Sequence, residues 1–221
     1  MSEKTSKTIT ILIADDEPMA RAGIRAILSQ GDDFEIIGEA QDGSEVQELV
    51  PKLRPKILLL DYQMPGPRAA EQEEWVRKNY PETAVLILTA HDRDEYLAKV
   101  INSGIAGFLL KNENAEQLIT AVRHAAEGTV YFRDEQIERA QNWKHDIEEK
   151  WESLSHRERE ILQHLARGAG NKTIAQTLTI TVKTVEFHVT NILKKLDLKS
   201  RDEAIVWMLK HQPDDPWITK D

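Results

Sequence analysis

Three aspartates stand where short apolar runs of the sequence end. Asp15 and Asp16 close the run ITILIADD, and Asp61 closes the run KILLLD. Runs of this length, rich in leucine or β-branched residues, are typical of strands buried on both faces of a parallel sheet. In an open α/β sheet, ligands bind in the crevice outside the carboxyl ends of the strands. We therefore expect the three carboxylates to meet at one edge of a sheet.

Carboxylates crowded into one place repel one another unless a cation binds among them. Mg2+ prefers oxygen ligands and is usually held by one or two carboxylates together with waters and phosphate oxygens. The sequence thus predicts a magnesium site with one acid left to react. In this prediction Asp61 attacks a phosphoryl donor and becomes an acyl phosphate, while Mg2+ neutralises the developing charge.

Two further polar residues follow apolar runs later in the chain. Thr89 ends the run AVLILT, and Lys111 follows the run GFLL. A hydroxyl and an ammonium at neighbouring strand ends suit a phosphoryl group, so we expect both to hold its oxygens. Each residue alone has a plainer explanation, because strand-end aspartates often serve as turn residues or helix N-caps and most lysines are solvated. The ordered set, each member on its own strand, favours the phosphoryl site.

This ordered set resembles the receiver domain of two-component response regulators over roughly residues 8–128. The resemblance implies a flavodoxin-like α/β fold, a five-stranded parallel sheet in the order 2-1-3-4-5, and phosphorylation of Asp61 by a sensor histidine kinase. It also implies a set of magnesium ligands, namely Asp15, Asp16, Asp61 and the backbone carbonyl of Gln63. Pro65, four residues after Asp61, matches the family as well.

Phe108 also matches the receiver pattern, and it has two interpretations of about equal weight. In one, Phe108 is an aromatic switch that swings inward when Thr89 moves. In the other, Phe108 is simply a core residue of the fifth strand.

Strands and helices alternate to about residue 128. We expect strands near 8–14, 34–40, 57–60, 84–89 and 107–110, and helices near 18–29, 43–53, 69–79, 94–103 and 115–127. The sequence from Asn114 to Gln117 predicts a capping box for the fifth helix, and Gly128 predicts its end. Around AAEQEEWVRKNY only Trp75 and Val76 are large and apolar, so we expect the third helix to be loosely held.

Composition places the protein among water-soluble globular proteins, because 40% of its 221 residues are hydrophobic and 30% are charged. The absence of cysteine excludes disulfides, thiolate nucleophiles and zinc–cysteine sites. No apolar run is long enough to span a membrane, and residues 1–7 are polar rather than signal-like, so we expect a cytoplasmic protein without membrane contact.

Charge is unevenly distributed along the chain. Residues 150–211 contain eleven Lys or Arg and seven Asp or Glu, a net charge of +4. Since the whole chain carries −9, the rest carries −13. An acidic first part and a basic last part are expected of two domains with different partners.

The last third of the chain has the pattern of four short helices. Residues Ser155 to Glu158 and Ser200 to Glu203 each form a capping-box motif, and Gly168 marks a helix end. Between them NKTIAQTL and TVKTVEFHVTNILKKL, joined by the short turn TIT, predict a helix-turn-helix. Residues 152–211 closely resemble the LuxR-type DNA-binding domain. Together the two resemblances imply a transcriptional regulator of the NarL/FixJ class, with double-stranded promoter DNA as a partner and a homodimer on phosphorylation.

The second helix of this motif predicts one buried and one DNA-facing side. A stripe at spacings of three and four should be buried, namely Val182, Val185, Val189, Ile192 and Leu196. Base or phosphate contacts are expected from Lys172, Lys183, Thr184, Glu186, Phe187, Thr190, Asn191, Lys194, Lys195, Lys199 and Arg201. Glu186 and Thr190 depart from the family, where basic residues are common. Glu186 either accepts from cytosine or merely pairs with a nearby cation such as Lys183.

The domains expected from these patterns are a receiver over 1–130, a helical linker over 131–151, the DNA-binding domain over 152–211 and a tail over 212–221. In the linker a narrow apolar stripe recurs at spacings of three and four, namely Ile137, Ala140, Trp143, Ile147 and Trp151. The stripe either packs on the protein's own domains or contributes to a dimer seam. We favour the first interpretation, since the stripe is short for a coiled coil.

Two other functions compete with a regulator. A magnesium-dependent phosphohydrolase of the haloacid-dehalogenase type also uses an aspartyl phosphate, but it needs an acid two residues after the nucleophile. That position is Gln63, which cannot act as a general acid, so we do not expect an enzyme. A LuxR-type receptor for a small molecule would need a ligand cavity in its first domain, where the acidic set indicates phosphate instead.

Overall fold

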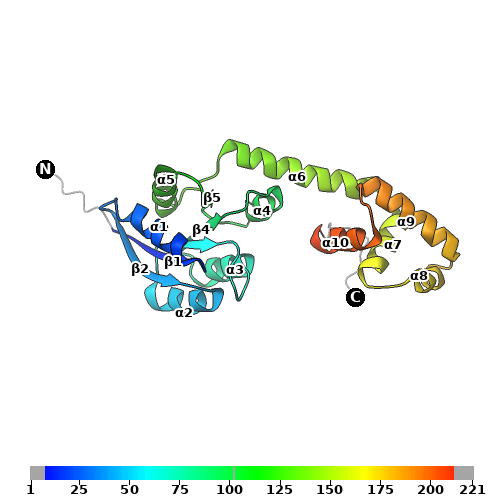
Figure 1. Ribbon diagram of the computed structural model, residues 1–221, viewed down its shortest axis with the longest axis horizontal. Helices are drawn as coiled ribbons and strands as arrows, with labels where there is room; N and C mark the ends of the chain where they lie inside the picture. The colour runs from blue at the N-terminus through cyan, green and yellow to red at the C-terminus, as the bar shows by residue number, and fades with distance from the viewer. Residues whose placement is uncertain (1–7, 102, 212–221) are drawn as a thin grey trace. The chain divides into compact units, whose positions relative to one another are not determined.

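The computed structural model describes residues 8–101 and 103–211 of the protein (Figure 1). The chain divides into two compact units, one ending at Gln141 and the other beginning at Asn142. The expected tail over 212–221 and the polar residues 1–7 lie outside the described residues. Within the described residues no helix is both long enough and apolar enough to cross a bilayer.

The first unit is built on a five-stranded parallel sheet in the order β2-β1-β3-β4-β5, which confirms the expected topology. Its strands are β1 (Ile9–Ala14), β2 (Phe34–Ala40), β3 (Ile57–Asp61), β4 (Ala84–Thr89) and β5 (Gly107–Leu110). The central strand β3 is buried at every residue, as its run of aliphatic side chains predicts.

Helices cover both faces of this sheet. They are α1 (Pro18–Leu28), α2 (Gly43–Leu53), α3 (Ala69–Asn79), α4 (Asp94–Val100) and α5 (Ala115–Ala126). Because side chains alternate along a strand, Ile11 and Ile13 of β1 pack in the cluster that includes α1 and α5. Leu12 and Ala14 pack in the opposite cluster, with α2, α3 and α4. Hydrophobic layers therefore pack against both faces of the sheet. Figure 1 shows the helices that supply them on either side of the sheet.

Local sequence explains most helix ends. Asn114 and Gln117 form the expected capping box of α5, and Gly128 adopts a left-handed φ of +78° after that helix. The expectation of a loosely held α3 is wrong. Gln72 and Glu73 are buried beside Val76, and the Gln72 amide donates to the carbonyl of Gly43. Hydrogen-bonded polar side chains therefore supply the packing that the helix lacks in apolar ones.

Helix α6 (Asp134–Ser153) divides its apolar stripe between the two units. Ala140 is buried in the core of the first unit, whereas Ile147 and Trp151 pack in the core of the second. Ile137 is 37% exposed and packs on neither core. Ala140, Ile147 and Trp151 thus pack within the protein's own units, and a role of the stripe in a dimer seam stays untested.

The second unit consists of the end of α6 together with α7 (His156–Ala166), α8 (Asn171–Thr177), α9 (Val182–Leu196) and α10 (Arg201–His211). Its core includes the expected Val185, Ile192 and Leu196, all buried. Val182 is the exception, because it is the first residue of α9 and is 37% exposed. The turn between α8 and α9 places Thr179 at a left-handed φ of +54°, and Thr181 caps α9 by accepting from the amide of Thr184.

An ion pair between a buried carboxylate and a partly exposed lysine ties α7 to α9. Glu158, 4% exposed, completes the capping box with Ser155 and accepts from the ammonium of Lys195 at 2.7 Å. Burial alone would raise the pKa of Glu158, but the hydrogen bonds from Lys195 and from the amide and hydroxyl of Ser155 lower it below its usual value. The folded unit therefore stabilises the ionised carboxylate.

We expect Glu158→Gln to lower the free energy of unfolding of the second unit by about 1–2 kcal/mol at neutral pH, since Lys195 is partly solvated. Because the folded pKa is lowered, this contribution is complete above the ordinary value of 4.5 and is lost as pH falls through the lower folded pKa. Urea unfolding followed by tryptophan fluorescence, measured against pH, tests this.

Glu160→Gln is the matched control, since Glu160 pairs with Arg157 one turn away at a more exposed position. Its loss should cost about 0–1 kcal/mol. A difference between wild type and Glu158→Gln that stays constant down to the most acidic pH studied would contradict the assignment.

Candidate functional site

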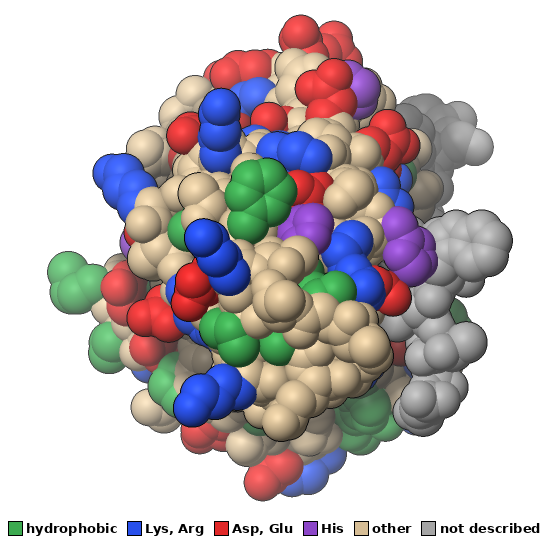
Figure 2. Space-filling view, turned by 90° about the vertical axis from the view of Figure 1, so that its right-hand side faces the viewer, with side chains coloured by type: hydrophobic (Ala, Val, Ile, Leu, Met, Phe, Trp, Pro, Cys, Tyr) green, Lys and Arg blue, Asp and Glu red, His purple; other side chains and the backbone are tan. Residues whose placement is uncertain are grey.

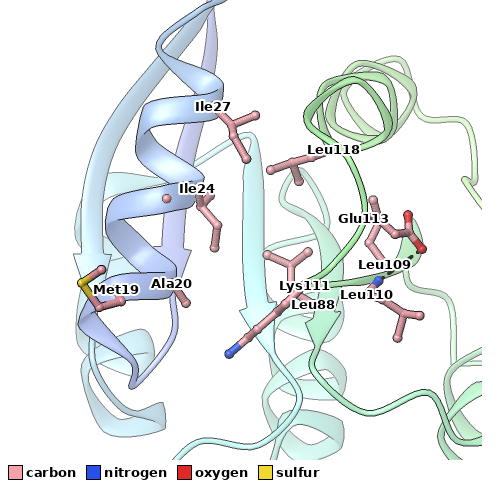
Figure 3. A pocket seen from close by; sticks show the side chains of 11 residues that line it. Met19, Ala20, Ile24, Ile27, Leu88, Leu109, Leu110, Lys111, Glu113 and Leu118 are labelled. Atoms are coloured by element: carbon pink, nitrogen blue, oxygen red, sulfur yellow. Dashed lines mark hydrogen bonds between the residues drawn. The ribbon is translucent and has the colours of Figure 1, made fainter.

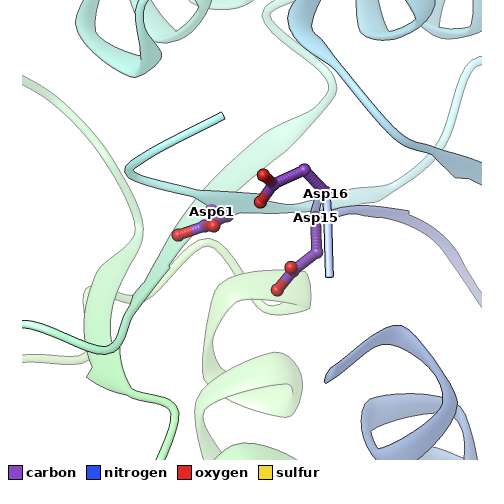
Figure 4. A group of neighbouring side chains, drawn as sticks. All are labelled: Asp15, Asp16 and Asp61. Atoms are coloured by element: carbon purple, nitrogen blue, oxygen red, sulfur yellow. The ribbon is translucent and has the colours of Figure 1, made fainter. Parts of the chain in front are cut away.

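The three aspartates meet as expected at the carboxyl edge of the sheet. Asp15 and Asp16 follow β1 and Asp61 ends β3, its neighbour in the sheet. Each offers a carboxylate oxygen, and these oxygens lie within 4.8 Å of one another (Figure 4). Asp15 is fully buried and Asp61 is 4% exposed, whereas Asp16 is exposed. The cluster is therefore buried on one side and open to solvent on the other.

The ammonium of Lys111 enters this cluster from the end of β5. It lies 2.8 Å from Asp15 Oδ2, 3.1 Å from Asp61 Oδ2 and 3.5 Å from Glu17 Oε2. Burial would lower the pKa of Lys111, but its hydrogen bonds to Asp15 and Asp61 prevail and raise it. Burial raises the pKa of Asp61, while Lys111 opposes that effect. The lysine is thus firmly cationic and partly neutralises the acids.

Backbone amides fix the two buried carboxylates. The amide of Glu17 donates to Asp15 Oδ1 at 2.9 Å, and the amide of Gln63 donates to Asp61 Oδ1 at 3.2 Å. The donor set consists only of carboxylate oxygens, and one lysine cannot balance three acids. Both the oxygen chemistry and the residual negative charge fit Mg2+. Asp15, Asp16, Asp61 and the carbonyl of Gln63 remain the predicted ligands.

Sheet pairing brings Thr89 and Lys111 to the same edge as Asp61. Asp61 pairs with Leu88 of β4, the residue before Thr89, and the amide of Lys111 donates to the carbonyl of Thr89 at 2.8 Å. Thr89 is fully buried, and its hydroxyl accepts from the amide of His91 at 3.1 Å. Phe108 is 1% exposed within the core. It is thus a core residue in this structure.

The start of α6 contacts the loop that follows Thr89, which the sequence did not indicate. Arg139 forms ion pairs of 2.7 Å with Asp92 and 2.6 Å with Asp94. One turn earlier, the buried amide of Gln136 donates to the carbonyl of Phe108 at 3.4 Å. The helix that leads out of the first unit is therefore attached both to the Thr89 loop and to β5.

A second missed contact joins the loop after Asp61 to α4. The side-chain amide of Gln63 donates to the hydroxyl of Tyr96 at 3.0 Å, and the rings of Tyr62 and Tyr96 lie 4.2 Å apart. Aromatic residues at these positions were visible in the sequence. Their partnership was not, because they are more than thirty positions apart.

An apolar hollow of about 250 Å³ adjoins the site between α1 and α5. Figure 3 shows Ile24 and Ile27 of α1 facing Leu118 of α5 across it, with Lys111 at its lower end. Met19 on the first turn of α1 also lines the hollow and is 84% exposed. An exposed apolar side chain next to a charged site is suited to contact with another protein.

Most of the residues expected to contact DNA lie on the surface of the second unit. The exposed ones are Lys172, Lys183, Glu186, Phe187, Thr190, Lys194, Lys195 and Lys199, while Thr184, Asn191 and Arg201 are half-buried. Phe187 is 63% exposed, which is unusual for an aromatic side chain on a soluble domain. Figure 2 views the protein from the side of α8 and α9 and shows basic side chains scattered among acidic and uncharged ones.

Two of the residues expected to contact phosphates form hydrogen bonds with other residues of the second unit. Lys195 donates to the carbonyl of Ser153 and to Glu158. Arg201 donates to Asn171 Oδ1 at 2.8 Å and to the carbonyl of Ala169 at 2.6 Å. Both cations therefore have partners within the unit, and their contacts with DNA stay a prediction. Among the described residues no cation lies within ion-pair distance of Glu186. The pairing with Lys183, one of the two interpretations of Glu186, is therefore not seen.

Comparison with known protein families gives two matches. Residues 11–123 match the response regulator receiver domain, and residues 152–208 match the bacterial regulatory proteins of the luxR family. Among curated proteins, the oxygen regulatory protein NreC of Staphylococcus haemolyticus is 39% identical over 209 residues, and that of Staphylococcus carnosus is 38% identical over 209 residues. Each alignment covers 90% of this chain and 96% of the relative.

Solved structures of response regulators also match the chain over most of its length. RcsB of Salmonella typhimurium has the same fold, with a TM-score of 0.71 at 23% identity over 91% of this chain and all of its own. The response regulator ChrA of a heme-sensing two-component system is 30% identical, with a TM-score of 0.57, and the match covers 93% of this chain and 98% of ChrA. The chain belongs to the response regulators that join a receiver domain to a DNA-binding domain of the luxR family.

Proposed function

We propose that this protein is a transcriptional regulator whose DNA binding is controlled by transfer of a phosphoryl group from a sensor histidine kinase to Asp61. The observation that carries the proposal is the meeting of Asp15, Asp16, Asp61 and Lys111 at one sheet edge, in a chain that also has a luxR-type helix-turn-helix. Because its target is chromosomal DNA, the protein acts in the cytoplasm.

Asp61 supplies the nucleophile. One of its carboxylate oxygens forms a bond to phosphorus while the bond between phosphorus and the donor breaks, and the donor leaves with the electron pair. Mg2+, when bound by the aspartates and the Gln63 carbonyl, supplies charge neutralisation for the transferred group. Lys111, now 3.1 Å from Asp61 Oδ2, donates to a phosphoryl oxygen, and the Thr89 hydroxyl donates to another.

One feature supports a protein as the phosphoryl donor, and a second argues against a phosphohydrolase. The open side of the acid cluster is at Asp16, next to the first turn of α1, where Met19 is exposed. Gln63 occupies the position where a phosphohydrolase of the aspartyl-phosphate type needs a general acid, so hydrolysis is not promoted there.

The output passes through α6. When the Thr89 hydroxyl turns to the phosphoryl group, it gives up its hydrogen bond with the amide of His91. The adjacent Asp92 and Asp94 are held by Arg139, so movement of this loop shifts the start of α6. Helix α6 continues to Ser153 in the second unit, where Trp151 is part of the core.

The second unit reads DNA with α9. Exposed Lys183 and Lys194 contact phosphates, and exposed Glu186 and Phe187 contact base edges in the major groove. One such unit neutralises few phosphates, so two copies of the chain bind half-sites about one helical turn apart.

Asp61→Asn should abolish phosphorylation by acetyl phosphate, because the amide cannot act as the nucleophile. Intact-mass spectrometry should detect one hydroxylamine-sensitive phosphoryl group on wild type with Mg2+, and none after chelation of the metal. The exposed Asp32→Asn variant serves as the control and should label normally. Normal labelling of Asp61→Asn would refute the assignment.

Arg139→Gln should leave phosphorylation of Asp61 intact and reduce the effect of phosphorylation on DNA affinity, because the Thr89 loop no longer holds α6. The readout is the ratio of DNA dissociation constants with and without phosphorylation, which should approach one. Lys144→Gln is the control on the same helix, since Lys144 makes only an exposed pair with Glu148. A ratio equal to that of wild type in Arg139→Gln would exclude this route.

Lys194→Ala and Lys195→Ala should differ although they are neighbours. Lys194→Ala should weaken binding to all DNA sequences alike and reduce the slope of log K against log salt by about one, with unchanged stability. Lys195→Ala should instead destabilise the second unit, because Glu158 loses its cation. DNA-binding titrations at several salt concentrations, paired with urea unfolding, separate the two effects. Equal losses of stability would contradict this division of roles.

A further inference from the structure

Arg21 reaches back from α1 to the backbone of the acid pair. Its Nη1 donates to the carbonyl of Asp15 at 2.6 Å, and only 11% of its side chain is exposed. This carbonyl belongs to the peptide that joins Asp15 to Asp16. A charge-assisted hydrogen bond therefore fixes the orientation of the peptide between two of the carboxylates in the cluster.

Other contacts hold Asp15 but do not hold this peptide. The amide of Asp15 donates to the carbonyl of Ala40 at 3.1 Å, and the amide of Glu17 donates to Asp15 Oδ1. The first anchors the Asp15 amide and the second closes a turn across Asp16, but neither contacts the carbonyl of Asp15. Asp16 is exposed, so packing does not position its carboxylate. Arg21 supplies the remaining restraint on that side of the cluster.

Glu39, near the end of β2, holds Arg21 in place. Its Oε2 accepts from Arg21 Nε at 3.2 Å, and its other oxygen pairs with Arg25, one turn further along α1. The carboxylate also balances the charge of Arg21. A guanidinium so close to a cation site would otherwise repel the cation. The pair Arg21–Glu39 thus restrains the loop without opposing a positive ion.

We propose that Arg21, held by Glu39, is a positioning residue that sets the Mg2+ affinity of the acid cluster by fixing the Asp15–Asp16 peptide. This inference rests on the proposed function, since it assumes that the cluster is the metal site. Replacing a residue that hydrogen-bonds to metal ligands commonly weakens metal affinity by about 10–100-fold.

If the Arg21–Glu39 pair had only a structural role, a different result would be expected. Arg25 distinguishes that role from a role in metal binding. Arg25 contacts the same Glu39 from the same helix, but 52% of its side chain is exposed, and its ion pair is with Glu39 rather than with the loop. If the acidic partner on β2 matters only for attaching α1, then loss of either arginine has similar consequences. If the Asp15 carbonyl matters, only Arg21 affects the metal.

The experiment compares full-length wild type with Arg21→Gln, Arg21→Lys and Arg25→Gln. Calorimetric titration with MgCl2 gives the Mg2+ dissociation constant, and thermal unfolding without Mg2+ gives the stability of each variant. We expect the dissociation constant to rise about tenfold for Arg21→Gln. Arg21→Lys should show a smaller rise, since an ammonium cannot reach Glu39 and the carbonyl with the same fork geometry. Arg25→Gln should bind Mg2+ like wild type.

Acetyl phosphate labelling at increasing MgCl2 adds a second readout. Arg21→Gln should need about tenfold more Mg2+ for half-maximal labelling yet reach the wild-type maximum. Unchanged Mg2+ affinity in both Arg21 variants, or an equal loss in Arg25→Gln, would overturn the inference. If Arg21→Gln is too unstable to study, the Arg21→Lys result decides.

Failure of the proposed function looks different. In that case wild type either does not bind Mg2+ at all or binds it equally well after Asp61→Asn. Wild type that binds Mg2+ through Asp61, with Arg21 variants that bind it equally well, rejects only the role of Arg21.

Discussion

The burial of negative charge at the carboxyl edge of the sheet is the constraint on which the rest of the first unit depends. Asp15 and Asp61 are almost completely removed from water, and moving an unpaired carboxylate into such a place is very costly. Lys111 is the cation that makes this burial tolerable, at 2.8 and 3.1 Å from the two carboxylates. One lysine leaves a negative balance, which a divalent cation would compensate.

The same constraint explains why the site is assembled from separate strand ends. In the order β2-β1-β3-β4-β5, Asp15 and Asp61 follow adjacent strands, while Thr89 and Lys111 follow the next two. A parallel sheet places all of these ends on one edge, so Thr89 and Lys111 lie beside Asp61. The attachments of α6 lie on that side of the sheet, at the loop after Thr89 and at the carbonyl of Phe108.

Ion pairs serve different purposes in the two units. In the first, the pairs of Arg21 and Arg139 hold loops beside the acid cluster, where a few tenths of an ångström matter for chemistry. In the second, Lys195 and Glu158 join α9 to the start of α7, and Arg201 joins α10 to the segment before α8. The basic charge of the second unit is thus divided between exposed lysines such as Lys194 and cations that have partners within the unit.

The sequence alone determined the fold and the members of the acid cluster, because both follow from local patterns. Apolar runs of strand length, each ending in a polar residue, predicted the strands to within about one residue, and cap residues such as Asn114 and Ser155 predicted helix starts. Helix α4 was predicted too long at its C-terminal end, since no glycine or cap marks Val100 as its last residue. The apolar pattern also predicted that Val182 is buried, whereas it is exposed, because a stripe does not reveal which residue begins a helix.

Only the tertiary structure decided the partners of charged side chains that are distant in sequence. Arg139 and Asp92 are 47 positions apart, Arg21 and Glu39 are 18 apart, and Lys195 and Glu158 are 37 apart. A sequence shows that such residues are charged, but the choice of partner depends on which helix face packs against which strand end. That choice gives Lys195 a buried carboxylate and a backbone carbonyl as partners although 37% of its side chain is exposed, because long side chains bind whatever carboxylate or carbonyl the packed backbone brings within reach.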